Sequence, residues 1–157
     1  MSATVSAFPI PPVVKTVTVR CAPATAFRAF TSEIGRWYPI DVYSVKPAVD
    51  CRLETHPGGR LYEIAADGQE TLWGHVLEWN PPHALALSWR ARVSDEEAQR
   101  IDVTFRAVAG GTQVRLVRAG WEKLKVDAVQ WRENYDRGWV EVFERRFKTF
   151  ADAAARS

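Results

Sequence analysis

Few side chains in this sequence combine a reactive type with a telling position, and the clearest of them is an arginine. Arg118 ends an alternating segment in which it shares a strand face with Val114 and Leu116. A buried guanidinium on that face needs either a carboxylate partner or an anionic ligand. Arg118 is therefore either a strand-end ion pair within reach of water or an anchor for a carboxylate or phosphate group.

A histidine and a glutamate are the candidates for proton transfer. His75 lies in the alternating segment Glu70 to Trp79, where it shares a face with Trp73 and Leu77. On an inward face it can contact a ligand or act as an acid or base, and otherwise it is a satisfied or surface histidine. Glu63 is the weaker candidate, because strand alternation places it on the outer face.

Aromatic side chains complete the candidate site. Trp37 ends a short helical pair before Pro39, where it either gates a cavity mouth or only packs. Trp121 and Trp131 flank the turn into a long C-terminal helix, next to the same opening. The residues that we expect to contact a ligand are Arg118, His75, Trp37, Tyr135, Trp73 and Trp139.

No other constellation of catalytic or metal-binding type occurs in the sequence. The three histidines and two cysteines do not stand at metal-ligand spacing, and there is no nucleophile elbow, phosphate-binding loop or dinucleotide fingerprint. The pairs Gly58-Gly59 and Gly110-Gly111 are typical of hairpin turns. We therefore expect no metal, no cofactor and no dedicated catalytic residue.

Composition limits the class of protein. The 157 residues fit one domain, and 46% hydrophobic residues with seven Trp allow a large core. A net charge of +2 gives no footprint for nucleic acid, and no apolar run is long enough to span a membrane. Two cysteines make no disulfide framework, so we expect reduced thiols and a cytoplasmic protein. We expect a flexible tail over residues 1–12 and one domain over 13–155.

The pattern along the chain predicts an α+β fold. Strand Val14–Arg20 precedes two short helices, Thr25–Thr31 and Glu33–Trp37, and a long helix, Asp127–Ala153, ends the chain. Six antiparallel strands joined by tight turns lie between them. These strands are Val45–Glu54, Arg60–Ile64, Glu70–Trp79, Leu85–Trp89, Ile101–Phe105 and Thr112–Arg118.

Aromatic residues recur along the predicted C-terminal helix at steps of three or four. That spacing puts them on one side of a helix, which then has a sheet to cover. A curved sheet closed over a helix often leaves a cavity, and this points to ligand binding. The stripe consists of Trp131, Tyr135, Trp139, Phe143, Phe147 and Phe150.

Short motifs in order along the chain resemble a known family. The segment Ala22–Phe27 resembles a helix start of the START-like superfamily, also called SRPBCC or Bet v 1-like. The chain is more closely similar to the homologues of the heat-shock-protein-ninety ATPase activator, the AHSA-type family. The resemblance implies a helix-grip fold, in which a curved antiparallel sheet wraps a long C-terminal helix around a cavity. Its motifs include Arg36-Trp37-Tyr38, Pro57-Gly58-Gly59-Arg60, Gly74–Glu78, Asn80-Pro81-Pro82, Ser88-Trp89, Gly110-Gly111-Thr112 and Gly138-Trp139.

One departure from the family bears on the site. The family often has a histidine near the end of its last strand, followed by Ser-Gly, whereas this chain has Arg118-Ala119-Gly120. A role tied to that histidine is therefore not carried over to this chain.

Three functions stay open on this evidence. The first is binding of a small hydrophobic or aromatic molecule in a cavity between sheet and helix. The second is an aromatase- or cyclase-like enzyme that moves protons through His75, Glu63 or Tyr135, for which no acid and base pair is evident. The third is a co-chaperone or interaction module. A homodimer is also expected, through tryptophans left on the outer face of the sheet.

Overall fold

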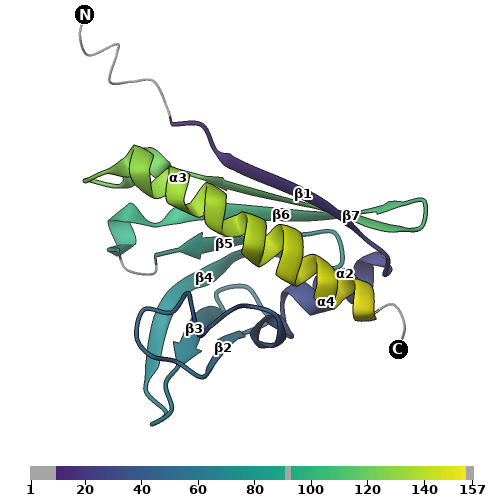
Figure 1. Cartoon of the computed structure of the whole chain (residues 1–157), viewed down its shortest axis with the longest axis horizontal. Coiled ribbons are helices and arrows are strands. Elements are labelled where there is room, and N and C mark those ends of the chain that lie inside the picture. Colours follow the sequence, from purple (N-terminus) through teal and green to yellow (C-terminus); the bar gives the residue numbers. More distant parts are fainter. Residues whose placement is uncertain (1–9, 91–92, 155–157) are drawn as a thin grey trace, which may run out of the picture.

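Seven strands form one antiparallel sheet in the order β1-β7-β6-β5-β4-β3-β2. The structure, a computed structural model, describes residues 10–90 and 93–154 (Figure 1). The last strand, β7, pairs with the first, β1, and β1 forms one edge of the sheet. The strands are β1 (Val13–Val19), β2 (Asp50–Leu53), β3 (Arg60–Ile64), β4 (Glu70–Asn80), β5 (Ala84–Trp89), β6 (Gln99–Val108) and β7 (Gly111–Ala119).

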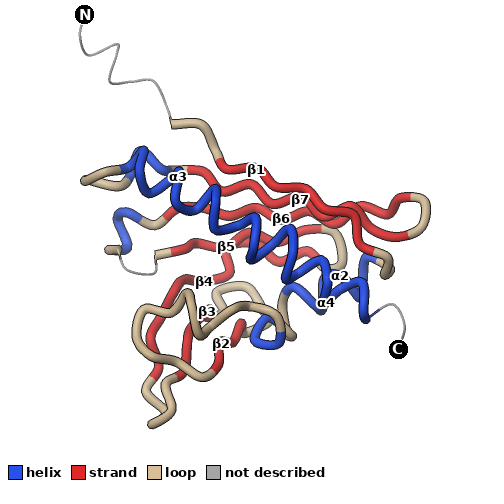
Figure 2. Tube along the Cα trace, in the orientation of Figure 1, coloured by secondary structure: helices blue, strands red, loops and turns tan. Residues whose placement is uncertain are grey.

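One long C-terminal helix crosses a face of this sheet, as Figures 1 and 2 show. It runs through α3 (Ala128–Trp139), a π-helical stretch η4 (Val140–Phe147) and α4 (Lys148–Ala154). The short helix α2 (Pro23–Phe30) and the 3₁₀ turn η1 (Ile34–Arg36) follow β1, and further 3₁₀ turns are η2 (Asp95–Glu97) and η3 (Trp121–Lys123). The α+β helix-grip fold expected from the sequence is confirmed.

The aromatic stripe of the helix supplies much of the core. Phe143 and Phe147 are fully buried and lie parallel to each other, with ring centroids 5.3 Å apart. Phe30 of α2 contacts both rings. Each fully buried aromatic side chain stabilises a fold by about 1.5–3 kcal/mol, so this half of the helix is integral to the core.

The strand expected at Val45–Glu54 is shorter than the alternation predicts. Only Asp50–Leu53 forms a strand, and Val49, which alternates in step with the buried Cys51 and Leu53, is 64% exposed. Pro47 has no backbone donor for a sheet, and the N–H groups of Val45 and Lys46 donate to a carboxylate rather than to a neighbouring strand. This segment is therefore a loop beside the helix.

The common face expected for His75, Leu77 and Trp73 is wrong. Trp73 is buried, but further along β4 it is Val76 that is buried, while Leu77 is exposed. The pairing of β4 with β3 shifts by one residue here, because Leu61 pairs with Gly74 and Tyr62 with Leu72, which leaves Trp73 as the extra residue. Such a bulge adds one residue and reverses the alternation beyond it.

The expectation that Glu63 faces outward is also wrong, because its side chain is only 1% exposed. Cys51 pairs with Glu63 and Leu53 pairs with Leu61, so these four residues share a sheet face. Cys51, Leu53 and Leu61 are all buried on that face. A carboxylate is thus held inside the sheet.

The predicted N-terminal tail is only partly within the described residues, since residues 1–9 lie outside them. Arg132 of α3 donates to the carbonyl oxygens of Pro11 and Pro12, at 3.0 and 2.9 Å. The chain just before β1 is thereby tied to the C-terminal helix. Within the described part of the chain, none of the helices has the length and apolar character needed to cross a bilayer.

Both cysteines, Cys21 and Cys51, are free thiols buried in the core. Burial raises the pKa of each thiol, that of Cys51 from near 9 to about 12. The folded chain therefore keeps the Cys51 proton that the unfolded chain loses. The contribution of Cys51 to stability is complete below pH 9 and is lost as the pH rises towards 12.

We expect both thiols to be unreactive towards Ellman's reagent at pH 8 in the native protein. Burial denies the reagent access and disfavours the reactive thiolate. In concentrated guanidinium chloride both should react at once, and the release of thionitrobenzoate measures this. Rapid reaction of Cys51 in the native state would contradict its burial.

Candidate functional site

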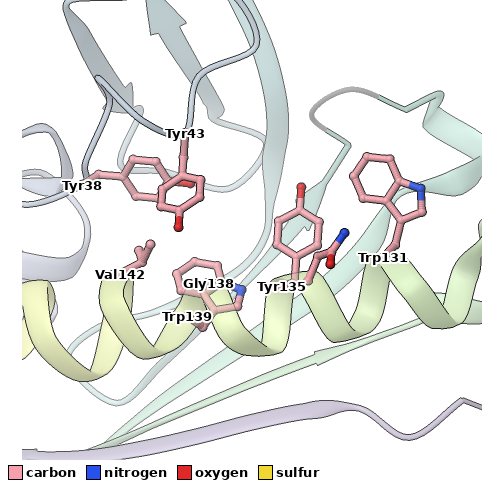
Figure 3. A pocket seen from close by; sticks show the side chains of 8 residues that line it. Tyr38, Tyr43, Trp131, Tyr135, Gly138, Trp139 and Val142 are labelled. Carbon is pink, nitrogen blue, oxygen red and sulfur yellow. The ribbon is translucent and has the colours of Figure 1, made fainter.

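A groove of about 260 Å³ opens between the C-terminal helix and the loop that follows η1 (Figure 3). Figure 3 shows rings from the helix facing two tyrosine rings from the loop side. Aromatic side chains dominate its walls, so a flat apolar molecule can contact rings on several sides. The groove is lined by Tyr38, Tyr43, Trp131, Asn134, Tyr135, Gly138, Trp139 and Val142.

Tyr135 is the central side chain of this groove. Its ring stacks on Trp131, with centroids 6.0 Å apart at 20°, and lies 5.5 Å from the ring of Trp121. Tyr135 also lines a smaller cavity of about 50 Å³, together with Trp73 and Trp89. The groove and the inner cavity therefore meet at this tyrosine.

Arg118 lies behind Tyr135, with only 1% of its surface exposed. Its guanidinium carbon is 3.9 Å from the Tyr135 ring centroid, 4.8 Å from that of Trp121 and 5.3 Å from that of Trp89. One hydrogen bond runs from Nη2 to Gln99 Oε1, at 2.6 Å. Burial lowers the pKa of Arg118 to about 10, so the side chain is still a cation at neutral pH.

No ion pair among the described residues involves Arg118. Its Nε and Nη1 are buried without an acceptor in the described structure, and so are the indole Nε1 atoms of Trp89 and Trp139. The Trp89 and Trp139 rings lie 5.8 Å apart. Burying an unsatisfied donor costs about 1–3 kcal/mol, and more when it is charged. The site thus has an excess of donors and suits a ligand that brings acceptor oxygens.

Glu63 is a buried polar residue near the site, although the alternation of its strand predicted that it faces outward. Its carboxylate accepts hydrogen bonds from Val45 N at 2.7 Å, Lys46 N at 2.9 Å and Trp73 Nε1 at 2.7 Å. It therefore fastens the loop that carries Tyr43 to the sheet. The pairing of Glu63 with buried Cys51 across β2 and β3 is the signal that places it inside.

The predicted site residues separate into three groups. Tyr135 and Trp139 line the groove, while Trp73 lines the inner cavity and Arg118 lies directly behind Tyr135. His75 is partly exposed and lines none of the described pockets. The indole of Trp37 packs on Phe30 and Phe147 and donates to the Ala29 carbonyl, away from the groove. The lining residues that the sequence reasoning missed are Tyr43, Asn134, Gly138 and Val142.

Five of the seven tryptophans are buried, and Trp79 and Trp131 are partly exposed. Each Trp lies in the described chain, and none is among its exposed large hydrophobic residues. A broad tryptophan surface, from which we expect a homodimer, is therefore not found in the described part of the chain, and the homodimer itself stays a prediction. Among the described residues, histidine, cysteine and carboxylate side chains form no cluster suited to a metal ion.

Comparisons with known proteins agree with this fold. An anthrahydroquino-γ-pyrone synthase, Txn09, is 31% identical over 90% of this chain and 97% of its own, with a TM-score of 0.61. The self-sacrificing resistance protein CalC from Micromonospora echinospora is 26% identical over 91% of this chain and 95% of its own, with a TM-score of 0.69.

A third solved structure, the Aha1 dimer from Colwellia psychrerythraea, shares the fold at 13% identity. It has a TM-score of 0.66 and aligns over 93% of this chain and 97% of its own. No curated protein sequence matches the chain significantly. The family model described as activator of Hsp90 ATPase homolog 1-like protein matches residues 20–152. The chain therefore belongs to this AHSA1 family.

Proposed function

We propose that this protein binds a flat aromatic molecule that carries an anionic oxygen. The ring system lies in the groove between Tyr43, Trp131 and Trp139, and the oxygen is directed towards Arg118. The observation that carries the proposal is the buried guanidinium, which has two nitrogens without an acceptor and no carboxylate partner in the described chain. A carboxylate, phenolate or enolate supplies both the charge and the acceptors.

One relative supports the same class of ligand. The name of the synthase that is 31% identical to this chain denotes a fused aromatic product. A groove with rings on both sides suits such a molecule, because stacked aromatic surfaces add to the area that is buried.

An enzyme is the second candidate, and the 31% identity to a synthase favours it. The donors around Arg118 can stabilise an enolate or phenolate that forms during a cyclisation. The lining of the groove includes no histidine or carboxylate to take a proton, so the base would have to come from the substrate or from water. Chromatography of a phenolic polyketide incubated with the protein tests this, and turnover above the uncatalysed rate would establish an enzyme.

We expect Gly138→Leu to block binding without damage to the fold. A Cβ at Gly138 meets only Tyr43 Oη, at 3.8 Å, so the fold has room for a side chain there. Leucine also favours a helix over glycine by up to about 1 kcal/mol. The added side chain fills the groove, and we expect affinity for anthraquinone-2-carboxylate to fall at least about tenfold, or about 1.4 kcal/mol. Quenching of tryptophan fluorescence measures the affinity, and urea unfolding measures the stability.

Val140→Leu is the matched control for this variant. Val140 is on the same helix, 49% exposed, and does not line the groove. We expect it to bind the probe as the unmodified protein does. Equal affinity of Gly138→Leu and the unmodified protein would mean that the ligand lies elsewhere.

Cytoplasmic location, a homodimer and a chaperone partner stay predictions. A relative of the same fold was solved as a dimer. Sedimentation equilibrium of the purified protein decides the oligomeric state directly.

A further inference from the structure

We infer that Tyr135 is a movable cover over Arg118, and that the anionic group of the ligand takes the place of the tyrosine ring on the guanidinium. The inference rests on the proposed function, because it describes how a ligand in the groove reaches the buried cation. It makes Tyr135 a positioning residue that controls entry.

The first support is that the groove and the cation are adjacent but separated. Arg118 is 1% exposed and lines neither the groove nor the inner cavity. The side chain between them is Tyr135, whose ring centroid is 3.9 Å from the guanidinium carbon. An oxygen in the groove can therefore approach Arg118 Nε or Nη1 only when this ring moves aside.

The second support is that the Tyr135 ring lies between two spaces, the groove and the inner cavity. Tyr38, Tyr43 and Tyr135 line both the groove and the smaller cavity that reaches Trp73 and Trp89. Rotation of Tyr135 away from Arg118 would connect the two spaces into one, with the donors of Arg118 and Trp89 at its inner end. Tyr135 thus separates two parts of what would otherwise be one continuous ligand site.

The third support is the kind of contact that holds the ring. Tyr135 is partly exposed and stacks on Trp131, which itself lies at the rim of the groove. Tyr135 contacts the cation through its ring and its neutral hydroxyl, whereas an anionic oxygen gives charge-assisted hydrogen bonds in the same buried place. An aromatic anion therefore competes well for the position, while a neutral aromatic molecule does not.

Phenylglyoxal, which modifies accessible arginines, tests the cover without any ligand. Mass spectrometry of the digested protein then reports on Arg118 separately from the surface arginines. We expect Arg118 to be protected in the unmodified protein and in Tyr135→Phe, which keeps a ring over the guanidinium. We expect Arg118 to be modified at least about tenfold faster in Tyr135→Ala. In this variant the reagent no longer has to wait for the minor conformation in which the Tyr135 ring has moved aside. Val129→Ala is the matched control, because Val129 is exposed on the same helix and lines none of the described pockets, so Arg118 should stay protected.

Binding kinetics give a second measure. Stopped-flow quenching by anthraquinone-2-carboxylate should show an association rate that rises at least about tenfold in Tyr135→Ala. It should change little in Val129→Ala, because Val129 is exposed on the same helix and lines none of the described pockets. The corresponding anthraquinone carboxamide, which lacks the charge, should bind more weakly to every variant. Circular dichroism confirms that each variant is folded before it is compared.

The outcomes separate the cover from the binding function. Arg118 that stays unreactive in folded Tyr135→Ala, or reacts equally fast in the unmodified protein, would overturn the cover. Arg118 that becomes reactive in Tyr135→Ala and is protected again by anthraquinone-2-carboxylate supports both. Reactivity that no aromatic anion suppresses would leave the cover established and overturn the proposed function.

Discussion

Replacing Arg118 by methionine is expected to abolish binding of anthraquinone-2-carboxylate and to leave the fold at least as stable as before. The guanidinium is buried without a carboxylate partner, and burial lowers its pKa, so the folded state carries an unfavourable charge. Methionine fills a similar volume and contacts the surrounding rings well. We expect stability to be unchanged or to rise by up to about 2 kcal/mol, after the loss of the Gln99 hydrogen bond and the ring contacts.

The same substitution removes the charge that the ligand needs. Loss of one partner of a buried, hydrogen-bonded charge pair costs about 2–5 kcal/mol of binding, so affinity should fall about 30-fold or more. Arg115→Met is the matched control, because Arg115 is on the same strand with its side chain exposed. Titration of tryptophan fluorescence and urea unfolding of the two variants give both quantities. Strong destabilisation with unchanged affinity would instead make Arg118 a structural residue of its aromatic cage.

Replacing Glu63 by alanine is expected to lower the free energy of unfolding by at least about 3 kcal/mol. The carboxylate is buried and accepts from Val45 N, Lys46 N and Trp73 Nε1. Without it the buried indole N–H of Trp73 and the partly buried N–H groups of Val45 and Lys46 lose their acceptor together, and a buried unsatisfied donor alone costs about 1–3 kcal/mol. Because the released loop carries Tyr43, we also expect weaker ligand binding. Urea unfolding measures the change in stability.

Two further variants show whether this effect comes from the buried hydrogen bonds. Glu63→Gln keeps one acceptor oxygen and should cost less than Glu63→Ala. Glu70→Gln changes a 45% exposed carboxylate that pairs with Arg60 on the same pair of strands, and it should cost no more than about 1 kcal/mol. Equal losses for Glu63→Ala and Glu70→Gln would refute the special role of Glu63.

The spacing of residues close in sequence was sufficient to predict the covered face of the C-terminal helix and the inward direction of Arg118. Aromatic residues at steps of three and four identify the covered face of the helix, and Phe143 and Phe147 are indeed fully buried. Arg118 is buried with Val114 and Leu116, as its strand parity indicates. These features depend on residues close in sequence, where the geometry of one helix or strand decides the outcome.

What periodicity missed depends on contacts between distant segments. The bulge at Trp73 reverses the buried face of β4 between Trp73 and Val76, and nothing in the alternation of one strand marks its place. The burial of Glu63 follows from loop N–H groups of Val45 and Lys46, which approach it only in the folded chain. Tyr43 reaches the groove on the same loop. The fold was therefore predictable from the sequence, whereas only part of the candidate site was.

The most direct test of the proposed binding site is to observe the donors that lack acceptors. In ¹H–¹⁵N spectra, the Nε–H of Arg118 and the indole N–H groups of Trp89 and Trp139 report on their own hydrogen bonds. On titration with anthraquinone-2-carboxylate we expect saturable shifts of the Arg118 signal and of at least one of these indoles, and much smaller shifts with the carboxamide. An unchanged Arg118 signal in a protein saturated with the carboxylate would contradict the proposal that the ligand's anionic group lies on Arg118.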